Sequence, residues 1–282
     1  MIIPVATEHG RATDNLFWIT MGVIGFVFVI TQVLLFWYSY KYQHSDSRKA
    51  YYYPHNNKLE VIWTMIPAIV MALLVFQGWK TWAQITSAAP ADSEIIEVVG
   101  KQFNWMVRYP GKDGKLGVVK HTLINSVNEF GMDFNDKNSM DDFTPMEIHV
   151  PVGRPVLFKI RARDVLHSVY VPHFRLKMDA VPGMATKFWF VADKTTLQMQ
   201  EETGNPNFKY ELACAEICGR GHFAMRMMVV VEEEAEYQKW LANQKAFAET
   251  NPDEVTAAKA NKMAITALPS ELEQPAAASE EL

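Results

Sequence analysis

Cysteine is scarce in this chain: Cys214 and Cys218 are the only two among 282 residues. Neither lies near the N-terminus, so the start of the chain offers no thiol for lipid attachment. The sequence also lacks Cys-x-x-Cys-His, the motif that attaches haem c, which excludes a covalent haem. No internal repeat is present, so the chain is not a repeat array.

Charged side chains are absent from residues 15–40 and 61–79. The first segment is long enough to cross a hydrocarbon core of about 30 Å as a helix, and the second is near the spanning minimum. Buried core helices are the alternative. Tryptophan near the segment ends, at Trp18, Trp37, Trp63 and Trp79, favours membrane helices. We therefore predict an external segment at 1–14 and a transmembrane hairpin at 15–85, with spans at about 15–40 and 61–84.

Positive charge is concentrated between the two spans, at Lys41, Arg48, Lys49 and Lys58, whereas only Arg11 precedes the first span. By the positive-inside rule, the connecting loop lies in the cytoplasm or mitochondrial matrix, and both termini lie outside. The first span is too long, and too far from a small-residue cleavage site, for a plain signal peptide. We expect the C-terminal part on the external side.

Short apolar or alternating stretches, punctuated by Gly, Pro, Asp and Asn, replace the helical pattern from about residue 92. They predict an antiparallel β-sandwich or barrel over residues 92–235. Residues 236–282 are rich in Ala, Glu and Lys, which predicts a surface helix followed by a disordered end. The predicted strands are 95–99, 103–109, 146–150, 156–160, 186–191 and 225–231.

Five side chains that can bind metals lie within residues 214–225: Cys214, Glu216, Cys218, His222 and Met225. Thiolates, imidazole and thioether form a soft set that selects copper over magnesium or calcium, and two thiolates can bridge two ions. The missing second histidine is best supplied by His167, which we place at the end of a strand. Three alternatives stay open: a disulfide between the cysteines, a tetrahedral zinc site, and buried free thiols.

The chain resembles subunit II of the haem-copper cytochrome c oxidases. The resemblance rests on Cys-x-Glu-x-Cys-x-x-x-His-x-x-Met at 214–225 and on Asp-Val-Leu-His-Ser at 164–168. Further matches lie at 60–68, 100–105 and 177–183, so that it covers about residues 15–235. The family has a cupredoxin-like Greek-key fold, which agrees with the predicted sandwich or barrel.

The resemblance implies a binuclear copper A centre. Cys214 and Cys218 would bridge both coppers, His167 and His222 would each bind one, and Met225 and the Glu216 carbonyl would be weak axial ligands. The Glu216 carboxylate would bind magnesium at the interface with subunit I, against the alternative of a surface acid. Asp164 would support His167.

The resemblance also implies a role for Glu60, at the cytoplasmic start of the second span, as the mouth of a proton channel into subunit I. An ordinary interfacial carboxylate is the alternative. We interpret His173 as a surface or packing residue, and His149 as a strand residue satisfied by local hydrogen bonds.

Two departures concern electron entry. The family's aromatic patch begins with a tryptophan, where this chain has Phe103, with Trp105 following. The next loop is not purely acidic, because Lys112 and Lys115 flank Asp113. A net charge of −5 favours a basic partner, although a solvated charged face would look similar. Acidic residues gather later, at Glu129, Asp133, Asp136, Asp141 and Asp142.

The resulting hypothesis is an electron-entry subunit of a terminal oxidase. It would accept electrons from a cytochrome c, or a cytochrome c domain, and pass them to haem in subunit I for dioxygen reduction and proton pumping. Expected partners are subunits I and III and membrane lipid, with no nucleic acid. The tail and loops favour a bacterial cytoplasmic membrane, with the copper domain in the periplasm, over a mitochondrial one.

Three other classes fit less well. A copper chaperone would have one anchor and an α/β pattern, and a quinol oxidase subunit II would lack the copper ligands. Nitrous oxide reductase shares the copper motif but not the membrane hairpin.

Overall fold

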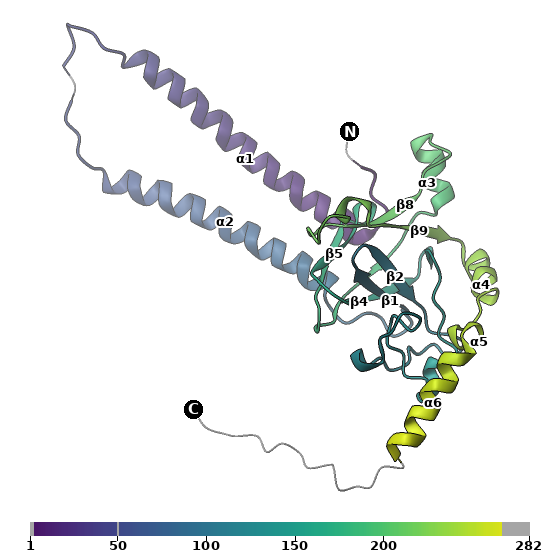
Figure 1. Ribbon diagram of the computed structural model, residues 1–282. Coiled ribbons are helices and arrows are strands. Elements are labelled where there is room, and N and C mark those ends of the chain that lie inside the picture. Colours follow the sequence, from purple (N-terminus) through teal and green to yellow (C-terminus); the bar gives the residue numbers. More distant parts are fainter. Residues whose placement is uncertain (1–2, 50, 267–282) are drawn as a thin grey trace, which may run out of the picture.

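The computed structural model describes residues 3–49 and 51–266. Two long helices, α1 (Glu8–Lys41) and α2 (Asn57–Ile85), extend from a β-domain, and the segment that connects them lies at their far end (Figure 1). Both are long and apolar enough to cross a membrane, and neither hydrophobic window is buried within the described structure. The predicted hairpin thus forms, with each helix longer than its predicted span.

Both helices begin at side-chain caps. The Thr7 hydroxyl accepts a hydrogen bond from the Gly10 amide, and the Asn56 side chain accepts one from the Leu59 amide. In return the Glu60 carboxylate accepts the Asn56 amide at 3.3 Å, which completes a reciprocal cap at the start of α2. Glu60 is exposed. Its carboxylate, in the first turn of α2, therefore has a local structural contact.

The N-terminal segment is held against the β-domain rather than free of it. The Ala6 amide donates to the His173 carbonyl at 2.9 Å, and the Thr7 hydroxyl donates to the Phe174 carbonyl at 3.0 Å. The guanidinium of Arg175 donates to both carboxylate oxygens of Asp14. These contacts fix the N-terminal end of α1 to the domain.

Two sheets form the β-domain. One has the order β2-β1-β4-β7, from β1 (Glu94–Lys101), β2 (Asn104–Arg108), β4 (Pro155–Ala162) and β7 (Thr186–Val191). The other has the order β3-β9-β8-β5-β6, from β3 (Ile148–Pro151), β5 (His167–Val171), β6 (Leu176–Ala180), β8 (Tyr210–Cys214) and β9 (Arg226–Glu232). Alternate residues of β4 and β9 are buried, as expected for strands with one face on a common core.

The prediction of an antiparallel domain was wrong in two places, because β1 pairs with β4 in parallel and β3 pairs with β9 in parallel. Parallel neighbours need a long crossover, and the long stretches of chain between these partners supply it. Short apolar strands carry no signal for the direction of pairing. The six predicted strands all form, but β5, β6, β8 and helix α3 (Thr196–Thr203) were not predicted.

The segment after the sheets is helical and lies beside the β-domain: α4 (Glu234–Ala242), α5 (Phe247–Thr250) and α6 (Pro252–Thr266) (Figure 1). Tyr237 of α4 is fully buried, and the Trp240 ring stacks on His149 with centroids 4.2 Å apart. A second small core joins Ala248 and Val255 to Phe130, Met132 and Phe134. The disorder predicted for the end of the tail concerns residues 267–282, outside the described residues.

Candidate metal centre

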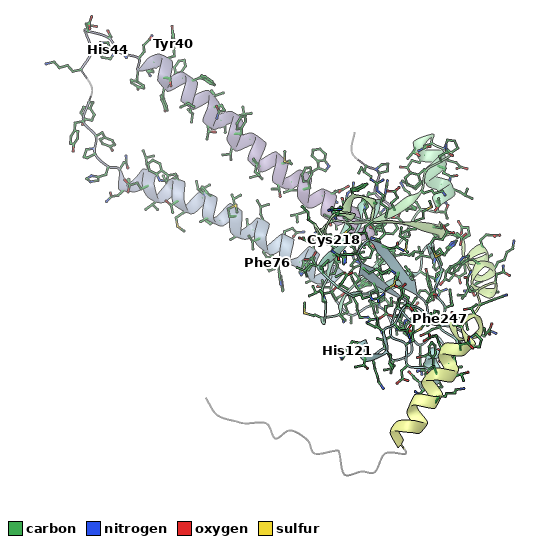
Figure 2. All side chains as sticks on the ribbon, viewed as in Figure 1. Tyr40, His44, Phe76, His121, Cys218 and Phe247 are labelled. Carbon is green, nitrogen blue, oxygen red and sulfur yellow. The ribbon has the colours of Figure 1, made fainter. Side chains whose placement is uncertain are left out.

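The ligand loop joins two neighbouring strands. Cys214 is the last residue of β8, Arg226 is the first of β9, and these strands pair with each other. Residues 215–225 therefore form the loop of a β-hairpin, with the short helix η4 (His222–Ala224) near the end of this loop. In the view of Figure 2, Cys218 lies on the side of the domain from which the helices extend, and Phe247 on the opposite side.

His167 reaches this loop from the neighbouring strand. It is the first residue of β5, not the end of a strand as predicted, and β5 pairs with β8 so that Val169 lies opposite Cys214. The side chain of His167 is fully buried. Sheet pairing thus brings His167 and Cys214 together, although 47 positions separate them in the sequence.

The donor atoms of His167, Cys214 and Cys218 all lie within 4.8 Å of one another. The Sγ atoms are 4.0 Å apart, His167 Nδ1 lies 3.9 Å from Cys214 Sγ, and His222 Nδ1 lies 3.7 Å from Cys218 Sγ. Metal–sulfur and metal–nitrogen bonds are about 2.3 and 2.0 Å in zinc proteins, so one ion between two such donors spans up to about 4.3–4.6 Å. All three separations fit a metal between the atoms.

Two weaker donors complete the set. Met225 Sδ lies 3.3 Å from Cys218 Sγ, and the Glu216 carbonyl oxygen lies 3.2 Å from Cys214 Sγ. Met225 is buried, whereas the Glu216 residue is exposed. A thioether beside two thiols suits a soft metal such as copper and has no role in a tetrahedral zinc site. The donor set therefore fits copper better than zinc.

Both cysteines are free, which argues against the disulfide alternative, since a disulfide bond needs sulfurs about 2.05 Å apart. Burial and the adjacent Cys214 thiol raise the pKa of Cys218 to about 11. A metal binds the thiolate, so binding must displace this proton. Without metal, the neutral thiol is the stable form at neutral pH.

Asp164 holds the histidine in the orientation that binding requires. Its Oδ1 lies 2.9 Å from His167 Nε2, so a proton on Nε2 leaves Nδ1 free to face the sulfurs. Asp164 also accepts the amides of Gln102 and Val165, each at 2.7 Å. Partial burial would raise the pKa of Asp164, but these hydrogen bonds and His167 lower it below its usual value. The carboxylate expected to support His167 is thus in contact with it.

The two aromatic residues predicted for electron entry occupy different environments. Phe103 is 40 % exposed, and its ring lies so close to the ligand loop that a Cβ on Gly221 would be 2.5 Å from Cγ. Trp105 is 1 % exposed, with its ring centroid 5.9 Å from that of His167. Of the two, Phe103 alone is accessible from the surface.

The two histidines interpreted as non-ligands lie away from the donor set. His173 packs edge-on against Phe208 and Tyr210, and burial and Arg175 lower its pKa. His149 lies in β3 with its ring nitrogens 3.0 and 3.1 Å from carboxylates of Glu232 and Glu147. Both interpretations are confirmed.

The later acidic residues have internal partners. Glu129 pairs with Lys101 and Arg163, Asp133 with Lys120, and Asp142 with Arg108. Asp136 and Asp141 accept backbone amides. These carboxylates stabilise the loop that contains them. A sequence pattern alone does not distinguish this role from the electrostatic attraction of a partner protein.

Sequence reasoning assigned no individual role to Gln102 and Gly100, although both belong to the 100–105 match. Gln102 binds Asp164 and, through its side chain, the Cys218 carbonyl at 2.6 Å. Gly100 leaves room for the His167 ring. Glycine and exposed glutamine are both common outside metal sites, so neither residue type could have identified itself.

Comparisons with known proteins match most of the chain. The family model for the periplasmic domain of cytochrome c oxidase subunit II matches residues 94–233, and the model for its transmembrane domain matches residues 3–80. The chain is 37 % identical over 250 residues to alternative cytochrome c oxidase subunit 2 of Bradyrhizobium diazoefficiens, covering 87 % of this chain and 84 % of the relative.

More distant relatives have the same kind of name. Cytochrome c oxidase subunit 2 of Thermostichus vulcanus is 26 % identical over 297 residues, covering 86 % of this chain and 78 % of the relative. The crystal structure of the periplasmic domain of subunit II of cytochrome oxidase from Bradyrhizobium japonicum is 25 % identical, covers 55 % of this chain and 95 % of that chain, and has a TM-score of 0.38.

Proposed function

The chain belongs to the cytochrome c oxidase subunit II family, and from this we propose that His167, Cys214, Cys218, His222, Met225 and the Glu216 carbonyl hold a binuclear copper A centre. The protein is a membrane-anchored subunit of an oxidoreductase of the haem-copper type. The copper count and the role of each ligand are the proposal. The observation that supports it is the convergence of one imidazole and two thiols within 4.8 Å, with a thioether beside them.

When bound, copper would supply a one-electron carrier. The protein's part is to hold the donor atoms still. Strands β5, β8 and β9 are hydrogen-bonded neighbours, Asp164 orients His167, and burial of Cys218, Met225 and His167 excludes water from one side of the site. Such a site needs little rearrangement when one electron arrives or leaves.

We further propose that a cytochrome c, or a cytochrome c domain, donates the electron and that haem in subunit I accepts it. The exposed Phe103 ring against the ligand loop supports a donor contact there. The exposed Glu216, between two ligand cysteines in the chain, supports magnesium binding where the loop meets subunit I. Glu60, at the opposite end of α2, is the proposed proton-channel entrance.

We propose that the domain faces the periplasm of a bacterial cytoplasmic membrane, since the connecting segment has the excess of Lys and Arg. A membrane-impermeant maleimide tests this in intact cells. Thr250→Cys, in a chain with Cys214 and Cys218 replaced by serine, should react, and Ser45→Cys should not. The reverse pattern would mean the opposite orientation.

The central test is copper content and electron paramagnetic resonance of the full chain in detergent after loading with copper. We expect two coppers per chain and hyperfine structure from one unpaired electron shared by both nuclei. His167→Ala should abolish this spectrum, whereas His121→Ala, at an exposed histidine away from the site, should not. One localised copper, or preferential binding of zinc, would refute the binuclear assignment.

A further inference from the structure

Gln102 lies in the two-residue turn between β1 and β2, and this turn touches both halves of the metal centre. Its backbone amide donates to Asp164 Oδ2 at 2.7 Å. Its side-chain Nε2 donates to the carbonyl of Cys218 at 2.6 Å. One residue therefore binds the carboxylate that orients His167 and the backbone of the loop that presents Cys218.

The hydrogen bonds of Gln102 connect two parts of the metal centre that are not connected by sheet pairing. His167 lies at the start of β5, whereas Cys218 lies midway along the loop beyond the end of β8. Sheet pairing fixes Val169 opposite Cys214, but it does not extend to Cys218. A continuous chain of contacts runs from the Cys218 carbonyl through Gln102 to Asp164 and then to His167 Nε2.

The neighbouring residue reinforces this contact without hydrogen bonds. The Phe103 ring lies against the backbone of Gly219 and Gly221, in the segment that follows Cys218. The turn thus holds the loop by a hydrogen bond before Gly219 and by ring contact after it. Solvent reaches Gln102, so its hydrogen bonds contribute modestly to the free energy of folding. Their main effect is on the position of the loop that contains Cys218.

We propose that Gln102 is a positioning residue that sets the distance between Cys218 and His167, and thereby the electronic structure of the metal centre. The inference rests on the proposed copper assignment for its functional meaning. The side-chain amide has a defined task, donation to one carbonyl, and this task cannot be performed by a side chain without a hydrogen-bond donor. A change at Gln102 should therefore alter the centre while leaving all metal ligands in the chain.

The test uses the full chain in detergent and the variant Gln102→Leu, which keeps approximate size and removes the donor. In the metal-free protein, amides of residues 219–222 should exchange with deuterium about two- to tenfold faster than in the wild type. After copper loading, two coppers should still bind, but the copper hyperfine couplings and the reduction potential should differ from the wild type.

Gln200→Leu is the matched control. Gln200 Nε2 also donates to a backbone carbonyl, that of Phe208 at 3.1 Å, but Gln200 lies in α3 away from the metal loop. Gln200→Leu should lower thermal stability to about the same extent as Gln102→Leu. It should leave the copper hyperfine couplings and the reduction potential unchanged. Rescue provides a further check: Gln102→His retains an N–H donor and should lie closer to the wild type than Gln102→Leu.

Unchanged loop exchange and an unchanged spectrum in Gln102→Leu would overturn the proposal and leave Gln102 an ordinary turn residue. If that variant does not fold, the same measurements on Gln102→Glu, which keeps the shape and loses the donor, decide the matter. Wild-type protein that binds one copper or none would refute the copper assignment. Hydrogen exchange in the metal-free protein would still show whether Gln102 holds the loop that contains Cys218.

Discussion

Gly100 of β1 lies against the imidazole of His167, so close that a Cβ at this position would be 2.8 Å from the ring carbon Cδ2 and 3.0 Å from Cζ3 of Trp105. Real Cβ contacts are essentially never below 3.0 Å, so the His167 ring or the backbone at Gly100 must move if a methyl group is added. Trp105 is packed in the core, and His167 is fully buried. The absence of a side chain at Gly100 is therefore a condition for the position of the imidazole.

Gly100→Ala should displace His167 and disturb its contact with Asp164. We expect a stability loss of about 1–3 kcal/mol, typical of overpacking, together with weaker copper binding or a changed copper spectrum. Gly22→Ala, in α1 where no atom lies within 4 Å of the added carbon, is the control and should change neither property. A normal copper spectrum in Gly100→Ala would show that the imidazole does not require this space.

The sequence indicated which side chains make up the candidate metal centre, but not how the fold brings them together. Cys214, Cys218 and His222 are recognisable as candidate ligands, because soft donors at such close spacing are rare outside metal sites and disulfides. His167 could be proposed but was placed at the wrong end of a strand, since His-Ser-Val-Tyr-Val is short and partly polar. Gln102 donates a hydrogen bond to a backbone carbonyl, and Gly100 leaves space for the imidazole ring. Neither role can be recognised from the amino-acid sequence.

The same limit applied to the fold. The apolar runs of α1 and α2 and six strands were evident, while α3 was not, although its capping box of Thr195 and Gln198 is a recognisable signal. The direction of the β1–β4 pairing depends on what the intervening chain can span, which local patterns do not encode. Acidic residues such as Glu129 and Asp133 were visible, but their lysine and arginine partners could be assigned only from the structure.

Trp240 should matter for stability and not for the metal. Its ring stacks on His149 and meets Tyr109 and Phe143 edge-on, so Trp240→Ala removes a large contact between α4 and the β-domain. Because Trp240 is half-buried, we expect a loss of about 2–3 kcal/mol in unfolding free energy. Thermal or denaturant unfolding measures it, and Lys239→Ala, an exposed neighbour, should be neutral. A matching loss of copper binding would contradict this separation.

Glu97 should govern part of the loss of stability in acid. Burial raises the pKa of Glu97, but Arg108 and Arg161, each with a nitrogen 2.6 Å from the carboxylate, outweigh burial, so that the net pKa lies below the usual 4.5. The stabilisation is therefore present above about pH 4.5 and is lost as the pH falls through the lower folded-state pKa.

Glu97→Gln leaves two guanidinium groups without their carboxylate and should cost about 3 kcal/mol at pH 7, since Arg108 is buried. The difference from the wild type should shrink as the pH falls below about 4.5. Denaturant unfolding from about pH 3 to pH 7 would measure this, and a constant difference would argue against the shift.

Asp142 shares Arg108 with Glu97 yet should titrate with the opposite sign. Burial raises its pKa from 3.8 to about 6, despite hydrogen bonds from Arg108 and the Gly117 amide. The folded chain therefore binds this proton more tightly than the unfolded chain. Its contribution to stability should rise as the pH falls from about 6 toward 3.8, by at most about 1.4 kcal/mol per pH unit.

Asp142→Asn removes the titrating group and should flatten the pH dependence of stability between about pH 6 and pH 4, whatever its effect at neutral pH. Asp113→Asn, at an exposed loop residue, is the control and should keep the wild-type slope. If Asp142→Asn keeps that slope as well, the proton is bound elsewhere.

Phe103 should affect the rate of electron entry without changing the metal centre. It is the exposed one of the two aromatic residues predicted for entry, and it lies on the ligand loop. Phe103→Leu would remove the aromatic contact surface while keeping an apolar side chain against Gly221. Stopped-flow reduction of the copper-loaded chain by reduced cytochrome c at low salt should slow about fivefold or more, the effect of losing one interface hot spot. The reduction potential should stay the same.

Phe223→Leu is the comparison for the Phe103→Leu measurement. It is 81 % exposed and lies in the ligand loop, next to His222, so a donor could in principle approach there instead. If Phe223→Leu slows reduction and Phe103→Leu does not, the donor contacts the face of the loop that bears Phe223. If both variants slow reduction equally and shift the potential, the aromatic rings shape the centre and do not form the donor contact. Only a selective effect of Phe103→Leu on the rate agrees with electron entry at Phe103.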